Sequence, residues 1–218
     1  MFIGHFALGF GAKKAAPRVS LGTLFLAAQF ADLLWPVLLL AGIERVEIRP
    51  GATPVNPFIF TSYPYSHSLV ALIVWGLLFA AAHRALRRTT AGVSLLLAAL
   101  VVSHWVLDYA THLPDMPIGL SGPFVGLGLW RSRPATIAVE TALYLGGVAI
   151  YARATEARDR TGAVALWALV VFLLIFYLGS VFAPPPPSVT AVAMGTLSMF
   201  LIVLWGYWLD SHRRPAGR

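Results

Sequence analysis

The chain has 218 residues, of which 58% are hydrophobic and 11% are charged. A soluble domain typically carries about 25% charged residues, so this composition excludes an ordinary soluble protein and indicates an integral membrane protein. The chain has no cysteine, which excludes disulfides and thiolate metal sites. Its net charge of +7 would suit nucleic acid, but we expect no nucleic-acid partner, because basic residues also mark the loops of membrane proteins.

Five apolar segments reach the roughly 20 residues that a membrane-spanning helix needs. They cover residues 19–43, 66–86, 90–110, 162–183 and 188–209, and a sixth segment at 134–153 is interrupted by Glu140. We therefore predict an all-α integral membrane protein, a bundle of about six transmembrane helices that forms one domain over residues 1–218. Residues 1–12 are apolar but too short to cross a bilayer and lack a basic leader, so we expect a retained half-helix or re-entrant segment.

The basic residues divide unequally between the two sides of such a bundle. Four of the 16 lie in one set of loops, at Arg45, Arg49, Arg131 and Arg133, and the others lie in the opposite loops and towards the termini. Loops rich in Lys and Arg stay in the cytoplasm. We expect a plasma (inner) membrane protein whose N-terminal basic segment and C-terminus are cytoplasmic, with loops 44–65, 111–133 and 184–187 facing outward.

Two of the outward loops have unusual compositions. Residues 44–65 contain four prolines, which predict an irregular and stiff loop. Residues 113–133 combine Gly and Pro with mostly apolar side chains. An apolar loop just outside the membrane is typical of a re-entrant lid or of a flap that contacts lipid.

The most informative motif lies near the end of the third span, where His104 and Asp108 are four residues apart. On a helix, positions i and i+4 lie on one face about 5–6 Å apart, and His112 follows one turn further along that face. A charged side chain in lipid costs at least about 2.5–3.5 kcal/mol, so such residues are normally paired, bound to metal or directed into a cavity. Taken alone, His104 and Asp108 fit equally well a hydrogen bond that stiffens the bundle.

Other ionisable residues fall at a similar depth. A rise of about 1.5 Å per residue from the cytoplasmic end places five of them about 20–27 Å up their helices: Asp32, His67, Glu140, His104 and Asp108. His5 lies lower, about 12 Å up, and joins this layer only if the N-terminal segment tilts or inserts beneath the cluster. Pro36 removes the N–H that would bond the Asp32 carbonyl, which predicts a kink there, and Pro64 predicts a helix start just before His67.

Neutral imidazole and carboxylate groups are the ligands of zinc, iron and manganese sites. We therefore interpret four residues as ligands of a mononuclear or dinuclear site for a divalent metal ion, Zn²⁺ by preference: Asp32, His67, His104 and Asp108. Such an ion lowers the pKa of its bound water towards about 7, and Glu140 or His112 would be the catalytic group that shuttles the proton. Considered alone, Asp32 could be a helix-packing residue and His67 a residue of the membrane interface. These simpler interpretations do not explain why the residues lie at a common depth.

Four short segments resemble the YdjM-like family of membrane-bound, metal-dependent hydrolases. They are residues 2–9 (around His5), 28–32, 65–69 and 103–108, so the resemblance covers roughly the first half to two thirds of the chain. It implies a metal site formed by His5, Asp32, His67, His104 and Asp108, which adds His5 to the set. The chain departs from the family in having one acid in the segment that ends at Asp32, and in lacking the Arg-Gly-X-Thr-His form around His67.

These features predict a membrane-embedded, metal-dependent hydrolase that cleaves an ester of a lipid or amphipathic substrate near the outer leaflet. A phosphoester is the preferred candidate. Loop 113–130 would admit the tail, while Arg131 and Arg133 would hold an anionic headgroup. The alternative is a proton-coupled transporter or permease that uses the same His/Asp cluster, but it predicts polar residues continuing to the cytoplasmic face, where the spans are nearly free of charge. A membrane scaffold with basic loops would leave the buried layer unexplained.

Overall fold

The computed structural model describes residues 1–217 and is mostly helical. Four single helices are long and apolar enough to cross a membrane: α5 (Leu69–Arg87), α6 (Ala91–Thr111), α7 (Arg133–Ala154) and α8 (Arg160–Phe182). A fifth span consists of α9 (Val189–Leu197) and α10 (Met199–Ser211), and the bent pair α2 (Leu21–Ala28) and α3 (Phe30–Leu40) makes a sixth if it is counted as one. The described residues form no closed sheet. The predicted all-α membrane bundle of about six spans is confirmed.

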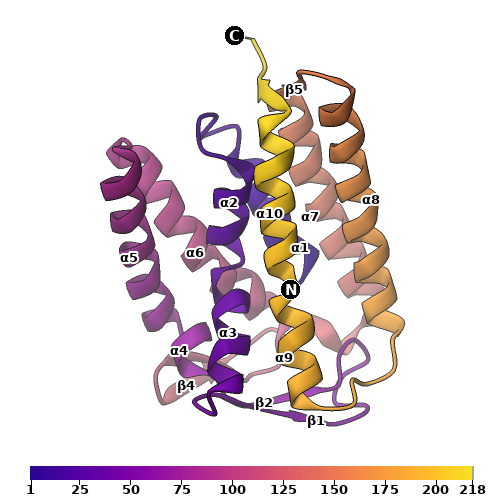
Figure 1. Cartoon of the computed structure of the whole chain (residues 1–218). Helices are drawn as coiled ribbons and strands as arrows, with labels where there is room; N and C mark the ends of the chain where they lie inside the picture. Colours follow the sequence, from indigo (N-terminus) through magenta and orange to yellow (C-terminus); the bar gives the residue numbers. More distant parts are fainter. Residues whose placement is uncertain (218) are drawn as a thin grey trace.

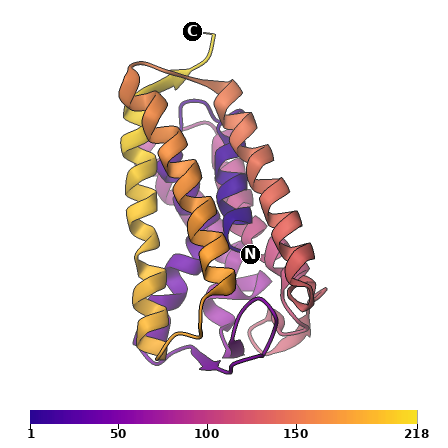
Figure 2. The same cartoon turned by 90° about the vertical axis from the view of Figure 1, so that its right-hand side faces the viewer.

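The first helix, α1 (Ile3–Ala12), lies inside the bundle. Helices α5 and α6 form one side, α7, α8 and α10 the other, and α2 and α3 lie between them (Figure 1). α1 contacts α2, α6, α7 and α8, and the N-terminus lies at mid-height among the helices (Figure 2). The N-terminal segment is therefore a short apolar helix, as its length predicts, and it carries His5 into the middle of the bundle.

Side-chain caps fix where several helices begin. A Ser, Thr or Asp oxygen accepts a backbone N–H of the first turn, as N-cap residues do, at Ser20, Ser68, Thr90, Ser132, Asp159 and Ser188. The Ser68 cap starts α5 at Leu69, so the second span begins later than predicted. His67 lies before it in a separate one-turn helix, α4 (Pro64–His67), which begins at Pro64 as expected.

The first span is broken at Gln29, where α2 and α3 meet at an angle of 58°. This bend lies earlier than the kink predicted at Pro36, and α3 continues through Pro36 as a helix. The break places Asp32 in the first turn of α3. It also makes Ala28 the last residue of α2, and the last four carbonyls of a helix have no partner within that helix.

In the described residues, three small antiparallel two-stranded sheets lie at the two ends of the bundle, and the first two of them are hairpins. The loop after α3 contains β1 (Arg45–Ile48) and β2 (Phe58–Ser62), and the loop after α6 contains β3 (Met116–Gly119), β4 (Gly122–Val125) and the 3-10 turn η1 (Leu129–Arg131). At the opposite end, near the C-terminus, β5 (Thr155–Ala157) pairs with β6 (Arg213–Pro215). Leu120, Phe124 and Leu127 around β4 are exposed, and the flap that contacts lipid stays a prediction.

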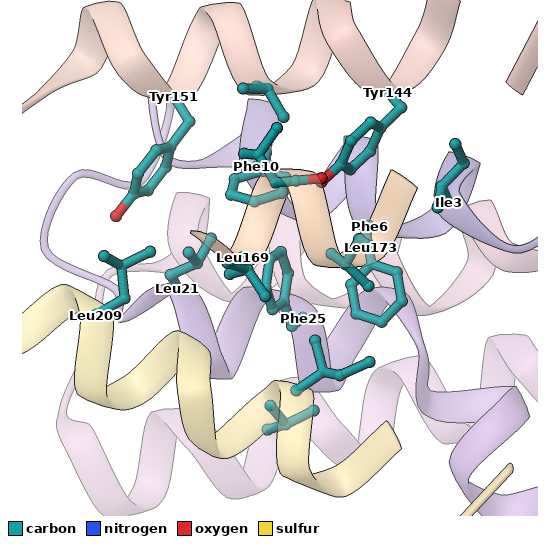
Figure 3. Packing of buried hydrophobic residues seen from close by; sticks show 14 of the residues in the cluster. Ile3, Phe6, Phe10, Leu21, Phe25, Tyr144, Tyr151, Leu169, Leu173 and Leu209 are labelled. Carbon is teal, nitrogen blue, oxygen red and sulfur yellow. The ribbon is translucent and has the colours of Figure 1, made fainter. Parts of the chain in front are cut away.

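Aromatic side chains of α1, α2 and α7 form a buried apolar layer across the bundle (Figure 3). Phe10 lies edge-on to Phe25 and Tyr151, with ring centroids 4.9 and 5.3 Å apart, and Phe6 lies edge-on to Phe25 at 5.0 Å. Such pairs add about 0.5–1.5 kcal/mol each beyond their buried area. The layer holds α1 in place between its neighbours.

An ion pair fastens the other end of α1. The buried Lys13 donates to the carboxylate of Asp210 at 2.6 Å and to the carbonyl of Val19 at 2.8 Å. Tyr151 donates to the second oxygen of Asp210 at 3.3 Å. Lys13 thereby ties the end of α1 to α10 and to the start of α2.

We expect Gly147→Ala to push α1 away from α7. A Cβ at Gly147 would collide with the carbonyl oxygen of Ala7 and lie 2.7 Å from its Cα, whereas a Cβ at the neighbouring Gly146 meets no described atom within 4 Å. Overpacking a tight contact typically costs about 1–3 kcal/mol, so the thermal unfolding midpoint in detergent should fall for Gly147→Ala. Gly146→Ala is the matched control, since both changes bring the same helix propensity. Equal midpoints for the two variants would refute the close contact of α1 and α7.

Candidate metal centre

Five predicted residues from four helices meet in one buried cluster: His5 of α1, Asp32 of α3, His67 of α4, and His104 and Asp108 of α6. Their ligand atoms form two groups, and within each group all the ligand atoms lie within 4.8 Å of one another. One group consists of His5, His104 and Asp108, and the other of Asp32, His67 and His104. The four residues other than Asp32 are buried, and the Asp32 side chain is 20% exposed. His5, placed below the others by residue counting, reaches the cluster because α1 lies inside the bundle.

Asp108 lies at the centre of this cluster, with its two carboxylate oxygens facing different partners. Oδ1 lies 3.1 Å from His5 Nε2 and contacts the α-ammonium group of Met1. Oδ2 lies 3.2 Å from His104 Nε2 and 3.8 Å from the Nε2 atoms of His67 and His112. Asp32 Oδ1 adds contacts of 3.5 Å to His67 Nε2 and 3.7 Å to His104 Nε2.

The bend of the first span orients the imidazole of His104. Its Nδ1 lies 3.0 Å from the carbonyl oxygen of Ala28, the terminal carbonyl of α2, so Nδ1 carries the proton and donates. Nε2 is fully buried and lies 3.2 Å from Asp108 Oδ2, but it forms no hydrogen bond of acceptable geometry within the described chain. In the neutral imidazole, Nε2 is the nitrogen that carries the lone pair. A buried polar atom without a partner is costly, and a bound cation would satisfy it.

His67 is oriented by a second chain of hydrogen bonds that the sequence interpretation missed. Its Nδ1 lies 2.7 Å from Ser66 Oγ, which donates to Glu44 Oε2 at 2.6 Å. The other oxygen of Glu44 accepts the backbone N–H groups of Tyr65 and Ser66 at 2.8 and 2.9 Å. Because Ser66 donates to Glu44, His67 must donate from Nδ1, and Nε2 is the nitrogen that faces Asp32 and Asp108.

His112 has the same arrangement. Its Nδ1 lies 3.0 Å from Asp115 Oδ1, and its Nε2 faces Asp108. Tyr63 donates to the Asp115 carbonyl at 3.1 Å and lies 3.4 Å from Asp115 Oδ1. Burial, reinforced by the nearby Asp115 carboxylate, raises the pKa of the Tyr63 hydroxyl well above its usual value, so Tyr63 remains a donor. Asp115 and Tyr63 thus keep the Nε2 lone pair of His112 turned towards the cluster.

Glu140 lies beside the cluster and anchors α1. Its Oε2 accepts the backbone N–H of Phe2 at 2.7 Å and that of Gly4 at 3.3 Å, two donors that the start of a helix leaves without partners. Glu140 therefore fixes the helix that carries His5. Its role as a proton shuttle remains a prediction.

A cavity of about 430 Å³ reaches the cluster, within the range usual for ligand pockets. Its polar part is lined by Asp32, His67, Asp108, His112 and Glu140. Its apolar walls come mainly from α8, α9 and the segment after β1, with Phe176, Val181, Val192 and Phe58 among them. Among the described residues of loop 113–130, which we expected to admit a tail, Trp130 alone lines this cavity.

The two predicted headgroup residues lie outside the cluster. Arg131 is exposed. Arg133 donates to the Pro54 carbonyl at 2.8 Å and lines a neighbouring pocket of about 440 Å³. That pocket shares Val55, Asn56 and Val181 with the main cavity, so Arg133 flanks the route to the cluster and does not touch it.

The donor set fits a divalent cation. In a tetrahedral site with bonds of about 2.0–2.2 Å, neighbouring ligand atoms lie about 3.3–3.6 Å apart. The four contacts from His67 Nε2 and His104 Nε2 to Asp32 Oδ1 and Asp108 Oδ2 measure 3.2–3.8 Å. Asp32, His67 and His104 form a group whose ligand atoms all lie within 4.8 Å of one another, and Asp108 belongs to such a group with His5 and His104. Each ligating His also needs a partner for its other nitrogen, and His67 and His104 have one. The cluster can therefore hold a metal ion.

Comparison with family models, with curated proteins and with solved structures finds no match to this chain. The resemblance to YdjM-like hydrolases stays a prediction from its motifs.

We expect Ser66→Ala to weaken metal binding without unfolding the protein. The change breaks the link between Glu44 and His67, and loss of such a partner typically costs 10–100-fold in metal affinity. Competition with a fluorescent chelator on purified protein measures this affinity. Ser103→Ala is the control, since Ser103 precedes His104 but donates only to the Leu100 carbonyl, at 2.7 Å. Equal affinities for the two variants would contradict the role of Ser66.

Proposed function

We propose that this protein is a membrane-embedded, metal-dependent hydrolase that cleaves an ester in an amphipathic lipid, with a phosphoester as the preferred candidate. One observation carries the proposal. His67, His104 and His112 each use Nδ1 for a protein partner and turn Nε2 towards Asp108. This arrangement lies at the polar end of a largely apolar cavity.

Each residue then has a separate task. Asp32, His67, His104 and Asp108 hold the ion, with Zn²⁺ as the preferred candidate, and the ion supplies Lewis acidity and a water of lowered pKa. His112 is the proton acceptor, because Asp115 keeps its Nε2 free and a positioned His contributes typically 10²–10⁴-fold as a general base. Glu140 lines the same cavity, and from there it would relay the proton.

The surroundings favour a substrate from the membrane. The helices indicate a membrane location, and the walls that α8 and α9 give to the cavity are apolar. We place the substrate tail along these walls, and not under loop 113–130 as the composition of that loop indicated. Arg133, in the neighbouring pocket, would hold an anionic headgroup. We also propose that the protein belongs to the YdjM-like family and that the cluster faces the extracytoplasmic side of the membrane.

The rival function is a proton-coupled transporter. Such a protein needs polar groups from one face of the membrane to the other, whereas Phe6, Phe10 and Phe25 belong to a buried apolar layer (Figure 3). Phe6 and Phe10 lie between His5 and Lys13 along α1, so this layer separates the cluster from the Lys13–Asp210 pair. This apolar layer supports a hydrolase with access from one end.

Hydrolysis of amphipathic phosphoesters and carboxylic esters in mixed micelles tests the proposal. Chelator-treated protein should lose activity and regain it with Zn²⁺ or Mn²⁺. His112→Gln should lower kcat at least 100-fold while metal content is unchanged, because His112 acts on the proton and not on the ion. His83→Gln, in the C-terminal half of α5, is the control.

Activity that survives metal removal, or full activity of His112→Gln, would overturn this mechanism. Proton-coupled solute uptake by proteoliposomes, together with no hydrolysis of any ester tested, would establish the transporter instead.

A further inference from the structure

The imidazoles of His5 and His104 are stacked. Their ring centroids are 3.6 Å apart and their planes are within 5° of parallel. Both rings are buried, and the two Nε2 atoms face opposite oxygens of the same Asp108 carboxylate, at 3.1 and 3.2 Å. Two ligands of one ion normally converge on it from different directions, and these two rings run side by side.

This parallel arrangement is incompatible with one shared ion. The lone pair of an imidazole nitrogen lies in the ring plane, so an ion bound end-on lies close to that plane. An ion in the plane of His104 would lie roughly one stacking distance away from the plane of His5. As a metal ligand, His5 would therefore need an ion of its own; without one, its Nε2 hydrogen-bonds Asp108 Oδ1 at 3.1 Å and its Nδ1 has no partner among the described residues. The metal ions of two-metal sites are about 3.5–4 Å apart, which is close to the stacking distance.

The carboxylate of Asp108 is placed to join two ions. Its Oδ2 faces His67 and His104, which with Asp32 form one set of ligands. Its Oδ1 faces His5 on the other side. A carboxylate that offers one oxygen to each of two groups of imidazoles can bridge two cations.

We propose that the cluster binds two divalent ions bridged by Asp108, one held by Asp32, His67 and His104 and the other by His5. This inference deepens the proposed hydrolase function and rests on it. The second ion would have few protein ligands. Its remaining coordination positions would face the cavity, which Met1 and Glu140 line beside Asp108. Paired ions hold the attacking and the leaving oxygen of an in-line displacement, which favours a phosphoester over a carboxylic ester as substrate.

A competing arrangement uses one ion. The α-ammonium group of Met1 contacts Asp108 Oδ1 and lies 3.3 Å from Thr111 Oγ1. This positive charge can compensate Oδ1 without a second metal. The two arrangements differ in the number of ions bound, so the stoichiometry decides between them.

Metal content of the full-length protein, purified in detergent and equilibrated with Mn²⁺, is the test. We expect two ions per chain by mass spectrometry, and an electron paramagnetic resonance spectrum with the exchange coupling of two neighbouring Mn²⁺ ions. His5→Ala should retain one ion and lose the coupling, and Asp32→Ala should also fall to about one. Asp108→Ala should lose both, whereas His83→Ala should keep two.

One ion per chain in the unaltered protein, with an uncoupled Mn²⁺ spectrum, would overturn the two-ion inference and leave the hydrolase proposal standing. Absence of any bound ion would overturn both. The spectrum of the unaltered protein decides the question even if a variant fails to fold, and retention of two coupled ions by His5→Ala would also refute the assignment of His5.

Discussion

A carboxylate placed inside a membrane bundle is expensive, since even the lower estimates put a charged side chain at the helix centre about 2.5–3.5 kcal/mol above an apolar one. Asp108 lies in the last turn of α6, away from the helix centre, but its side chain is almost fully buried among the helices. Imidazoles of His5, His67, His104 and His112 surround it, together with the Met1 ammonium group. Much of the structure serves to bring these groups to one carboxylate. The short helices α1 and α4 and the broken span of α2 and α3 are the elements that deviate from straight transmembrane helices, and each of them delivers or orients a residue of the cluster.

The break at Gln29 shows how a local defect is used. A straight helix would bond the Ala28 carbonyl to an N–H four residues later, but the end of α2 leaves it for His104 Nδ1 at 3.0 Å. The separate helix α4 has the same effect on the other side. It presents the N–H groups of Tyr65 and Ser66 to Glu44, and Ser66 then orients His67. These backbone interruptions thus provide the supporting hydrogen bonds that metal ligands require.

The sequence predicted the bundle and the cluster because both depend on simple regularities. Apolar runs set the spans, and the i, i+4 spacing of His104 and Asp108 set one face of α6. Counting residues placed His5 below the layer unless its segment tilts or inserts beneath the cluster, because the count assumes straight helices that all start at one membrane surface. α1 lies inside the bundle and brings His5 to the cluster. The bend was expected at Pro36 and lies at Gln29, which no proline marks. Glu44 and Asp115 were missed because they lie in loops whose hairpins carry no strong periodic signal. The spacing of three between His112 and Asp115 was a signal that could have identified that pair.

We propose that these imidazoles and carboxylates bind metal and do not merely neutralise one another. Crystals of the purified protein, measured on both sides of the zinc and manganese absorption edges, test this most directly. We expect anomalous density between His104 Nε2, His67 Nε2 and the Asp32 and Asp108 carboxylates. The metal site would be contradicted if the cluster is well ordered, its side chains hydrogen-bond only to one another, and no anomalous density appears there after incubation with either metal.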